Sequence, residues 1–119
     1  MKYIEEAGLL EWVQGLEKGL DTVVGERGLK LSVGQKQRLN IIRGILLDKE
    51  MYILDEPTSN LDKETEKLIV KLIEKYLQDK TVVIVTHREE IKKMCTKHYK
   101  FENSTMGLEK EGELYAEYN

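Results

Sequence analysis

The chain has 119 residues, of which 40% are hydrophobic and 34% are charged, a balance typical of a soluble globular domain. Its net charge of −3 and the lack of a long basic run exclude a nucleic-acid-binding footprint. The single cysteine, Cys95, cannot form an internal disulfide and favours a reducing compartment. No stretch resembles a membrane span or a signal peptide, so we expect one cytoplasmic domain.

The N-terminal segment predicts a short helix followed by loops. Apolar residues recur every three positions, which indicates an opening helix: they are Ile4, Ala7, Leu10 and Val13. Glycines then interrupt the pattern and predict turns: they are Gly15, Gly19, Gly25 and Gly28. The next regular element therefore begins only after residue 30.

A capping box marks the start of the second helix. Ser32 and Gln35 have the Ser-x-x-Gln spacing, in which each side chain accepts a hydrogen bond from the other residue's backbone N–H. We expect a helix over about 33–47, with one apolar face formed by Leu39, Ile42 and Leu46. Without further context, Ser32 and Gln35 are most simply a helix cap.

The remaining elements alternate between strand and helix. Residues 51–55 predict a strand covered on both faces, because no polar residue precedes its terminal acid, and Pro57 ends it. Asp62 can cap an amphipathic helix, whose apolar face is Leu68, Ile69, Leu72, Ile73, Tyr76 and Leu77. A second buried strand (81–86), a helix (about 88–95) and a short strand (98–101) follow. This rhythm predicts parallel pairing in an α/β fold.

Two acidic residues, Asp55 and Glu56, stand at the end of the first predicted strand. A buried strand that delivers carboxylates to its tip is the arrangement that holds Mg²⁺ beside a nucleotide. On the dipeptide alone, a pair of solvated turn acids is an equally good interpretation. The surrounding motifs decide between the two.

These motifs together resemble the C-terminal part of an ABC transporter nucleotide-binding domain of the exporter type. The similar segments occur in the family's order: the loop before the signature (22–28), the signature (31–35), Walker B (51–56), the D-loop (59–62) and the switch histidine (86–87). One departure is Val33, which replaces the first glycine of Leu-Ser-Gly-Gly-Gln. Another is Asn60, which replaces the alanine of the D-loop.

The resemblance implies which residues bind ATP. The signature residues Ser32, Val33, Gly34 and Gln35 would contact ATP held by an opposite cassette, with the γ-phosphate bound by Ser32 and Gly34. Asp62 of the D-loop would contact the opposite subunit across the nucleotide. Because Val33 is not the residue that binds the phosphate, we expect its replacement of glycine to restrict packing more than function.

The resemblance also implies the catalytic residues. Asp55 would orient Mg²⁺ through water, and Glu56 would be the general base that polarises the attacking water. His87 would donate a hydrogen bond to the γ-phosphate. By contrast, His98 and Cys95 lack such a context and are expected to be satisfied or packing residues.

One family motif is absent from the sequence. No Gly-x-x-x-x-Gly-Lys-Ser/Thr phosphate loop is present, so these residues alone are expected to be inactive. In the family, the strand before that loop lies between those corresponding to 81–86 and 98–101, and its absence would leave a slot in the sheet. Residues 102–119 match poorly, although 111–114 resemble the usual end of the domain.

The predicted fold is therefore a partial P-loop NTPase core of the ABC type, with a mostly parallel sheet and flanking helices. Residues 1–47 would be the end of the helical subdomain and 48–119 the partial α/β core of the same domain. The implied function is ATP hydrolysis that powers transport, most plausibly export, in a head-to-tail pair of cassettes. The region of Glu26 would contact a transmembrane domain.

Two alternatives remain open. The chain could be a non-catalytic module that lends residues 32–35 in trans to another ATPase. It could also be the C-terminal half of the ATPase head of a chromosome-structure protein, in which a coiled coil separates the two halves of the head. The exporter-like residues 25–28 and the absence of heptad repeats argue against the latter.

Overall fold

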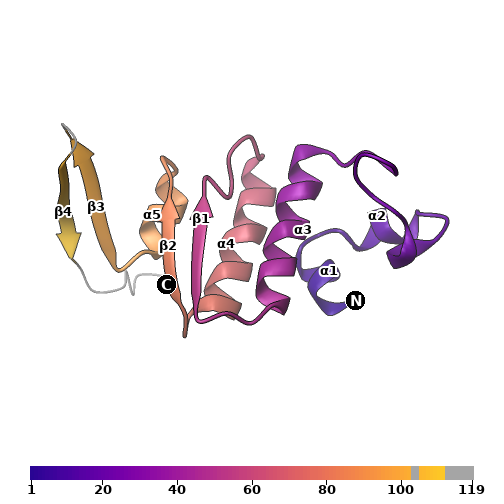
Figure 1. Ribbon diagram of the computed structural model, residues 1–119, viewed down its shortest axis with the longest axis horizontal. Helices are drawn as coiled ribbons and strands as arrows, with labels where there is room; N and C mark the ends of the chain where they lie inside the picture. Colours follow the sequence, from indigo (N-terminus) through magenta and orange to yellow (C-terminus); the bar gives the residue numbers. More distant parts are fainter. Residues whose placement is uncertain (103–104, 112–119) are drawn as a thin grey trace. The chain divides into compact units, whose positions relative to one another are not determined.

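The computed structural model describes residues 1–102 and 105–111, which belong to two compact units, Met1–Val85 and Thr86–Asn119. Figure 1 shows helices and strands alternating along the chain, which confirms the predicted α/β class. Residues 112–114, part of the predicted domain end, lie outside the described residues. Within the described part of the chain, no helix is both long and apolar enough to span a bilayer.

The opening segment forms two short helices where one was predicted. Helices α1 (Lys2–Glu6) and α2 (Leu10–Gln14) are separated at Gly8, which has a φ of +64°. A side chain at Gly8 would also crowd Leu68, because its Cβ would lie 2.8 Å from Cδ1 of that residue. The apolar spacing correctly predicted that Ile4, Ala7 and Val13 are buried, but because of this left-handed break Leu9 is buried while Leu10 is only half-buried. A 3-10 turn, η1 (Gly19–Asp21), follows.

Helix α3 (Val33–Leu46) begins where the capping box predicted, but its buried face differs from the prediction. Ile41 and Ile42 are buried, whereas Leu46 is 61% exposed. The reason lies in the strand that follows, because the ring of Tyr52 lies against Gly44 in the last turn of the helix. The helix therefore turns Gly44, and not Leu46, toward the strand.

Strands β1 (Met51–Asp55) and β2 (Thr81–Val85) form a parallel pair joined by helix α4 (Lys63–Leu77), as predicted. Asp62 caps α4, accepting a hydrogen bond of 2.9 Å from the backbone N–H of Thr65. The residues of α4 that are fully buried are Ile69, Leu72, Ile73 and Leu77, and Glu66 is buried with them. Helices α3 and α4 lie side by side (Figure 1).

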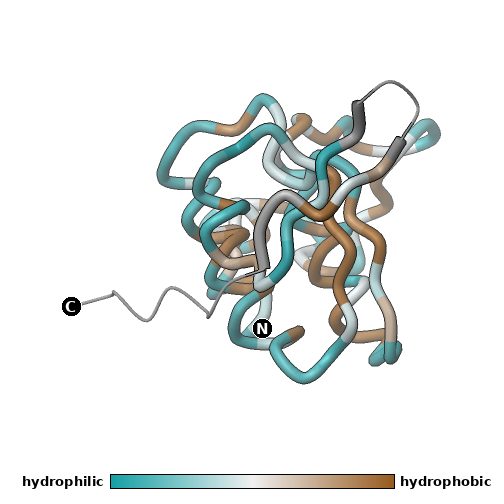
Figure 2. Tube along the Cα trace, turned by 90° about the vertical axis from the view of Figure 1, so that its left-hand side faces the viewer, coloured by the Kyte–Doolittle hydropathy of each residue, from teal (hydrophilic) through white to brown (hydrophobic). Residues whose placement is uncertain are grey.

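The two strands are not covered on both faces, which corrects the sequence prediction. Met51, Ile53, Val83 and Val85 are exposed, from 45% for Val83 to 71% for Ile53. Residues of this set alternate with half-buried or buried ones, so the pair has one helix-covered face and one open apolar face. Figure 2, in which the trace is coloured by hydropathy, shows hydrophobic stretches alternating with hydrophilic ones along the chain.

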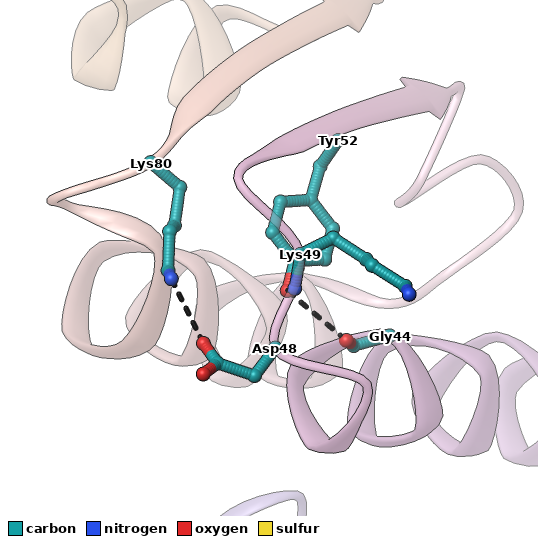
Figure 3. Close-up of polar contacts among 5 residues, drawn as sticks. All are labelled: Gly44, Asp48, Lys49, Tyr52 and Lys80. Atoms are coloured by element: carbon teal, nitrogen blue, oxygen red, sulfur yellow. Dashed lines mark hydrogen bonds and ion pairs between the residues drawn. The ribbon is translucent and has the colours of Figure 1, made fainter.

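A polar cluster closes the turn between α3 and β1 (Figure 3). The hydroxyl of Tyr52 donates to the carbonyl of Gly44 (3.2 Å) and accepts from the backbone N–H of Lys49 (2.8 Å). Beside it, Lys80 contacts Asp48 at 2.8 Å and lowers the pKa of that carboxyl. Asp48 has a φ of +44°, and the cluster fixes this turn.

Tyr52→Phe is expected to destabilise the first unit, because it leaves the backbone N–H of Lys49 without its acceptor. The loss of this buried hydrogen-bonding hydroxyl should lower the free energy of unfolding by about 1–2 kcal/mol. Urea unfolding followed by circular dichroism measures the change. Tyr99→Phe is the matched control, because it deletes the same hydroxyl from an exposed side chain. Equal losses for both variants would contradict the proposed importance of the cluster.

The second unit contains α5 (Glu89–Met94), β3 (Lys97–Glu102) and β4 (Thr105–Glu111). Strand β3 was predicted to join a parallel sheet, but within the described residues it pairs antiparallel with β4. Strand β4 was missed because its sequence is polar and contains Gly107. Neighbouring strands in sequence pair readily as a hairpin, which explains the local pairing. His98 is satisfied as expected, with Nε2 2.8 Å from the carbonyl of Lys92.

Candidate functional site

The signature segment forms the N-terminus of α3. Ser32 Oγ accepts from the N–H of Gln35 (3.1 Å), and Gln35 Oε1 accepts from the N–H of Ser32 (2.9 Å). The N–H groups of Val33 and Gly34 belong to the first turn, where a helix offers them no acceptor. The Ser32 hydroxyl retains its proton for a further bond. This helix end therefore has the donors that an anion such as a phosphate requires.

The two acidic residues occupy the end of β1. Asp55 is exposed, and Glu56 is half-buried with its backbone in the left-handed region, at a φ of +46°. The N–H of Glu56 donates to the carbonyl of Val85 at 2.8 Å, which keeps the ends of β1 and β2 together. A non-glycine residue in this conformation costs about 1–3 kcal/mol. The turn ends the strand's regular alternation, so the two neighbouring carboxylates are not bound to opposite faces of the strand.

The start of α3 contacts the D-loop segment directly. The side-chain amide of Gln37 donates to both the carbonyl (3.1 Å) and the hydroxyl (3.2 Å) of Ser59. Gly34 lies so near Leu61 that a Cβ on it would be 3.2 Å from Leu61 Cδ2. Helix α3 begins at the edge where β1 ends (top of Figure 1). The N-terminus of α3 and the carboxylates at the end of β1 are therefore held at one edge of the first unit.

Asp62 is engaged as the cap of α4. Its Oδ1 accepts from the backbone N–H of Thr65 (2.9 Å) and its Oδ2 from the Thr65 hydroxyl (2.8 Å). These bonds lower the pKa of Asp62 because they stabilise its charged form. Asp62 is exposed and remains ionised at neutral pH, so a charge is available at this edge.

Arg38 fixes the start of α3 to the opening helices. Its guanidinium donates to the carbonyl of Gly34 (3.1 Å) and to those of Ala7 (3.1 Å) and Gly8 (3.0 Å). The pKa of Arg38 is lowered by desolvation, an effect that Asp62 opposes. The charged side chain thus joins the first turn of α3 to the backbone at Ala7 and Gly8, behind the helix N-terminus.

The loop before the signature is a closed turn. The N–H of Leu29 donates to the carbonyl of Val23 (2.9 Å), and the N–H of Gly25 donates to the carbonyl of Leu29 (3.1 Å). A side chain at Gly28 would overlap the carbonyl of Val23, so only glycine fits there. Glu26 is exposed within this loop. The apolar residues exposed around it are Leu20, Val23, Val24 and Leu29.

His87 belongs to the second unit, directly after β2 in the chain, and its side chain is exposed. Next to it, the backbone N–H of Arg88 donates to the hydroxyl of Thr86 at 3.0 Å. The first unit thus brings together the signature, both carboxylates and Asp62, whereas His87 is placed with the other unit. Its predicted contact with a phosphate stays a prediction.

A metal site made by the protein alone is not present among residues 1–102 and 105–111, where no three His, Cys, Asp or Glu side chains gather. Mg²⁺ in a nucleotide site is held by one or two carboxylates together with substrate phosphates, so such a site would not require a cluster of this kind. Asp55, exposed at the end of β1, can supply one such carboxylate.

Sequence reasoning missed Gln37, which lies on the face of α3 that contacts the rest of the first unit. This face consists of Gly34, Gln37, Ile41 and Gly44, at spacings typical of one helical face. Only one of these residues is a large apolar one, so a search for hydrophobic periodicity cannot find the face. The signal available in the sequence was the spacing of Gly34, Ile41 and Gly44, which places two glycines and one isoleucine on the same helical face.

Comparison with known proteins shows which sequences this chain is similar to. The sequence profile of the family described as ABC transporter matches residues 5–59. The chain is 46% identical over 88 residues to an ATP-dependent lipid A-core flippase of Pasteurella multocida, covering 74% of the chain and 15% of that protein. It is 50% identical over 82 residues to the flippase of the same name from Pseudoalteromonas atlantica, covering 69% and 14%.

A relative from Bacillus subtilis, an uncharacterized ABC transporter ATP-binding protein, is 47% identical over 85 residues, covering 71% of the chain and 15% of that protein. The chain thus spans only a small part of the length of each relative. The region that matches the family profile nevertheless contains the N-terminus of α3, the carboxylates at the end of β1 and the contact of Gln37 with Ser59. On this sequence similarity and its family profile, the chain belongs to the ABC transporter family.

Proposed function

We propose that these residues form the C-terminal part of a P-loop ATPase cassette that hydrolyses ATP to power transmembrane transport. The observation that carries the proposal is the common edge at which α3 begins and β1 ends, with Gln37 and Ser59 joining them. A helix end with free donors and two carboxylates presented at one edge suit a cassette that faces a second one head to tail, because each cassette then offers its helix end to the ATP at the other's carboxylates. The chain itself contains no phosphate loop, so ATP would be gripped by other residues.

Each carboxylate has a separate role in this proposal. Glu56 accepts a proton from the attacking water as that water approaches the γ-phosphate. Asp55 orients Mg²⁺ through a water molecule. When bound, Mg²⁺ offsets the negative charge that develops on the phosphates. Asp55 is exposed and Glu56 is half-buried at the end of β1, so both carboxylates can be reached at this edge.

The signature residues act on ATP bound by a second cassette arranged head to tail. Ser32 and Gly34 donate to the γ-phosphate, with Val33 and Gln35 completing the helix end. Asp62 contacts the opposite subunit, and His87 donates a hydrogen bond to the γ-phosphate of the ATP at its own Walker B site. These contacts form only when the two cassettes close, so hydrolysis depends on dimerisation.

The partner on the membrane side is a transmembrane domain that receives the loop around Glu26. Support comes from the apolar residues exposed in and beside that loop, because exposed apolar surface marks an interaction site. The site of action is then the cytoplasmic face of the membrane. The two relatives named lipid A-core flippases favour export as the direction of transport.

The alternative is a non-catalytic module that lends the signature to another ATPase. The lack of a phosphate loop in these residues favours it. The two functions differ in their dependence on Glu56, because a module acting in trans needs Ser32 but not the general base.

Ser32→Arg tests the signature role in a cassette completed with a phosphate-loop half. We expect it to prevent Mg-ATP-dependent dimerisation, because the arginine side chain fills the space where the γ-phosphate docks. Sedimentation velocity in the non-hydrolysing Glu56→Gln background measures the dimer. Ser32→Ala is the comparison variant: it removes the cap, at about 1 kcal/mol, and the hydroxyl proposed to bind the γ-phosphate, but it adds no bulk, so it should weaken dimerisation less than Ser32→Arg. A Ser32→Arg protein that dimerised normally would overturn the assignment.

A further inference from the structure

The turn between β1 and α4 stores backbone strain. Two non-glycine residues in it have left-handed conformations, Glu56 with a φ of +46° and Asn60 with a φ of +60°. Such conformations persist only where the surroundings hold them. Within the turn, the N–H of Ser59 donates to the carbonyl of Glu56 at 3.1 Å. Thr58, between them, is completely buried.

Gln37 holds this turn from outside. Its Nε2 atom donates one hydrogen to the Ser59 carbonyl (3.1 Å) and the other to the Ser59 hydroxyl (3.2 Å). The backbone carbonyl of Ser59 can only accept a hydrogen bond, so Gln37 must turn Nε2, and not Oε1, toward Ser59. The bond spans from the second turn of α3 to the loop that carries Glu56. It therefore links the helix of the signature to the backbone of the general base.

The geometry of Gln37 also carries a cost. Its Oε1 atom is buried, and no described residue donates a hydrogen bond to it. A buried acceptor left without a donor opposes folding. A side chain kept only for stability would avoid this cost, since methionine has nearly the same shape and no unsatisfied oxygen. The amide is thus better explained by what it does to Ser59.

We propose that Gln37 is a positioning residue, which fixes the strained turn 56–60 and thereby aims the carboxylate of Glu56. The functional part of this inference rests on the proposed role of Glu56 as general base. Gln37 itself touches neither nucleotide nor water in the reaction. Its effect passes through Ser59, whose backbone is bonded to that of Glu56.

Hydrogen exchange of the 119-residue chain, followed by mass spectrometry, tests the positioning directly. In Gln37→Met, the amides of residues 56–61 should exchange roughly tenfold faster, while those of α4 keep their protection. Ser59→Ala removes only the hydroxyl acceptor and should give a smaller increase. Gln78→Met, the same exchange at an exposed position, should change neither region. Unchanged rates at 56–61 in Gln37→Met would overturn the inference.

Two further measurements keep the test decisive. If Gln37→Met loses protection throughout α4, Ser59→Ala alone decides: faster exchange confined to 56–61 supports the inference, and unchanged exchange overturns it. In a completed cassette, Gln37→Met should lower kcat roughly tenfold with KM unchanged, because only the orientation of the Glu56 carboxylate is lost and ATP binding is not. A raised KM with normal kcat would overturn the positioning role.

The failure of this inference is distinguishable from that of the proposed function. If Glu56→Gln retained turnover, the general-base role would be wrong, yet the exchange result at 56–61 would still be valid. If exchange at 56–61 did not respond to Gln37→Met, the positioning role would be wrong, while loss of turnover in Glu56→Gln would stand.

Discussion

Glu56→Gln is expected to reduce ATP turnover by roughly 100-fold to 10,000-fold in a cassette that contains this chain and a phosphate loop. Glutamine keeps the shape of the side chain but cannot accept the proton of the attacking water. ATP binding should persist, so ATP accumulates in a closed dimer of cassettes. Release of inorganic phosphate measures the turnover, and retention of radiolabelled ATP in the dimer fraction measures the trapping.

The matched control is Glu50→Gln, which makes the same change at an exposed acid just before β1. It should leave turnover within about twofold of the unaltered cassette, because surface substitutions away from the site change little. Near-normal turnover in Glu56→Gln would show that another group removes the proton. Residual stimulation of a second ATPase by the Glu56→Gln chain would favour the role in trans.

Residues 1–119 alone are expected to show no ATP binding in calorimetry at micromolar Mg-ATP. No lysine-containing glycine loop is present to cradle the β- and γ-phosphates. Addition of a separately produced phosphate-loop half of an ABC cassette should restore a soluble ATPase. The change from no measurable activity to turnover is the largest effect that we expect for this protein.

The open sheet gives the physical reason for this complementation. Met51, Ile53, Val83 and Val85 expose one apolar face, and within the described residues β2 pairs only with β1. An unpaired strand edge beside an apolar face invites another chain. Without the second half, we therefore expect self-association in sedimentation velocity. With it, a single complex should form.

A control for the complementation is a phosphate-loop half whose motif lysine is replaced by alanine. It should fill the sheet and suppress self-association but restore no hydrolysis. Micromolar affinity of residues 1–119 for Mg-ATP would contradict the proposal that other residues supply the grip on ATP. A monomer that unfolds cooperatively at high concentration would show that the open edge is not a binding surface.

The sequence by itself determined the elements whose signals are local. The Ser-x-x-Gln spacing fixed the start of α3, because a capping box satisfies its own backbone groups. Asp62 likewise fixed the start of α4. The apolar run at 51–54 predicted β1 and the β-branched run at 81–86 predicted β2. Their parallel pairing followed because a crossover helix separates them. The family's motifs could be recognised because their order and spacing are properties of the chain alone.

Only the tertiary structure decided which faces meet. The contact of α3 with β1 and the D-loop uses Gly34, Gln37 and Gly44, whose small or polar side chains give no hydrophobic signal. The open face of the sheet was also hidden, because an apolar strand has the same sequence whether or not a neighbour covers it. The left-handed turn at Glu56 exists because contacts distant in sequence hold it, and such contacts arise only in the folded chain.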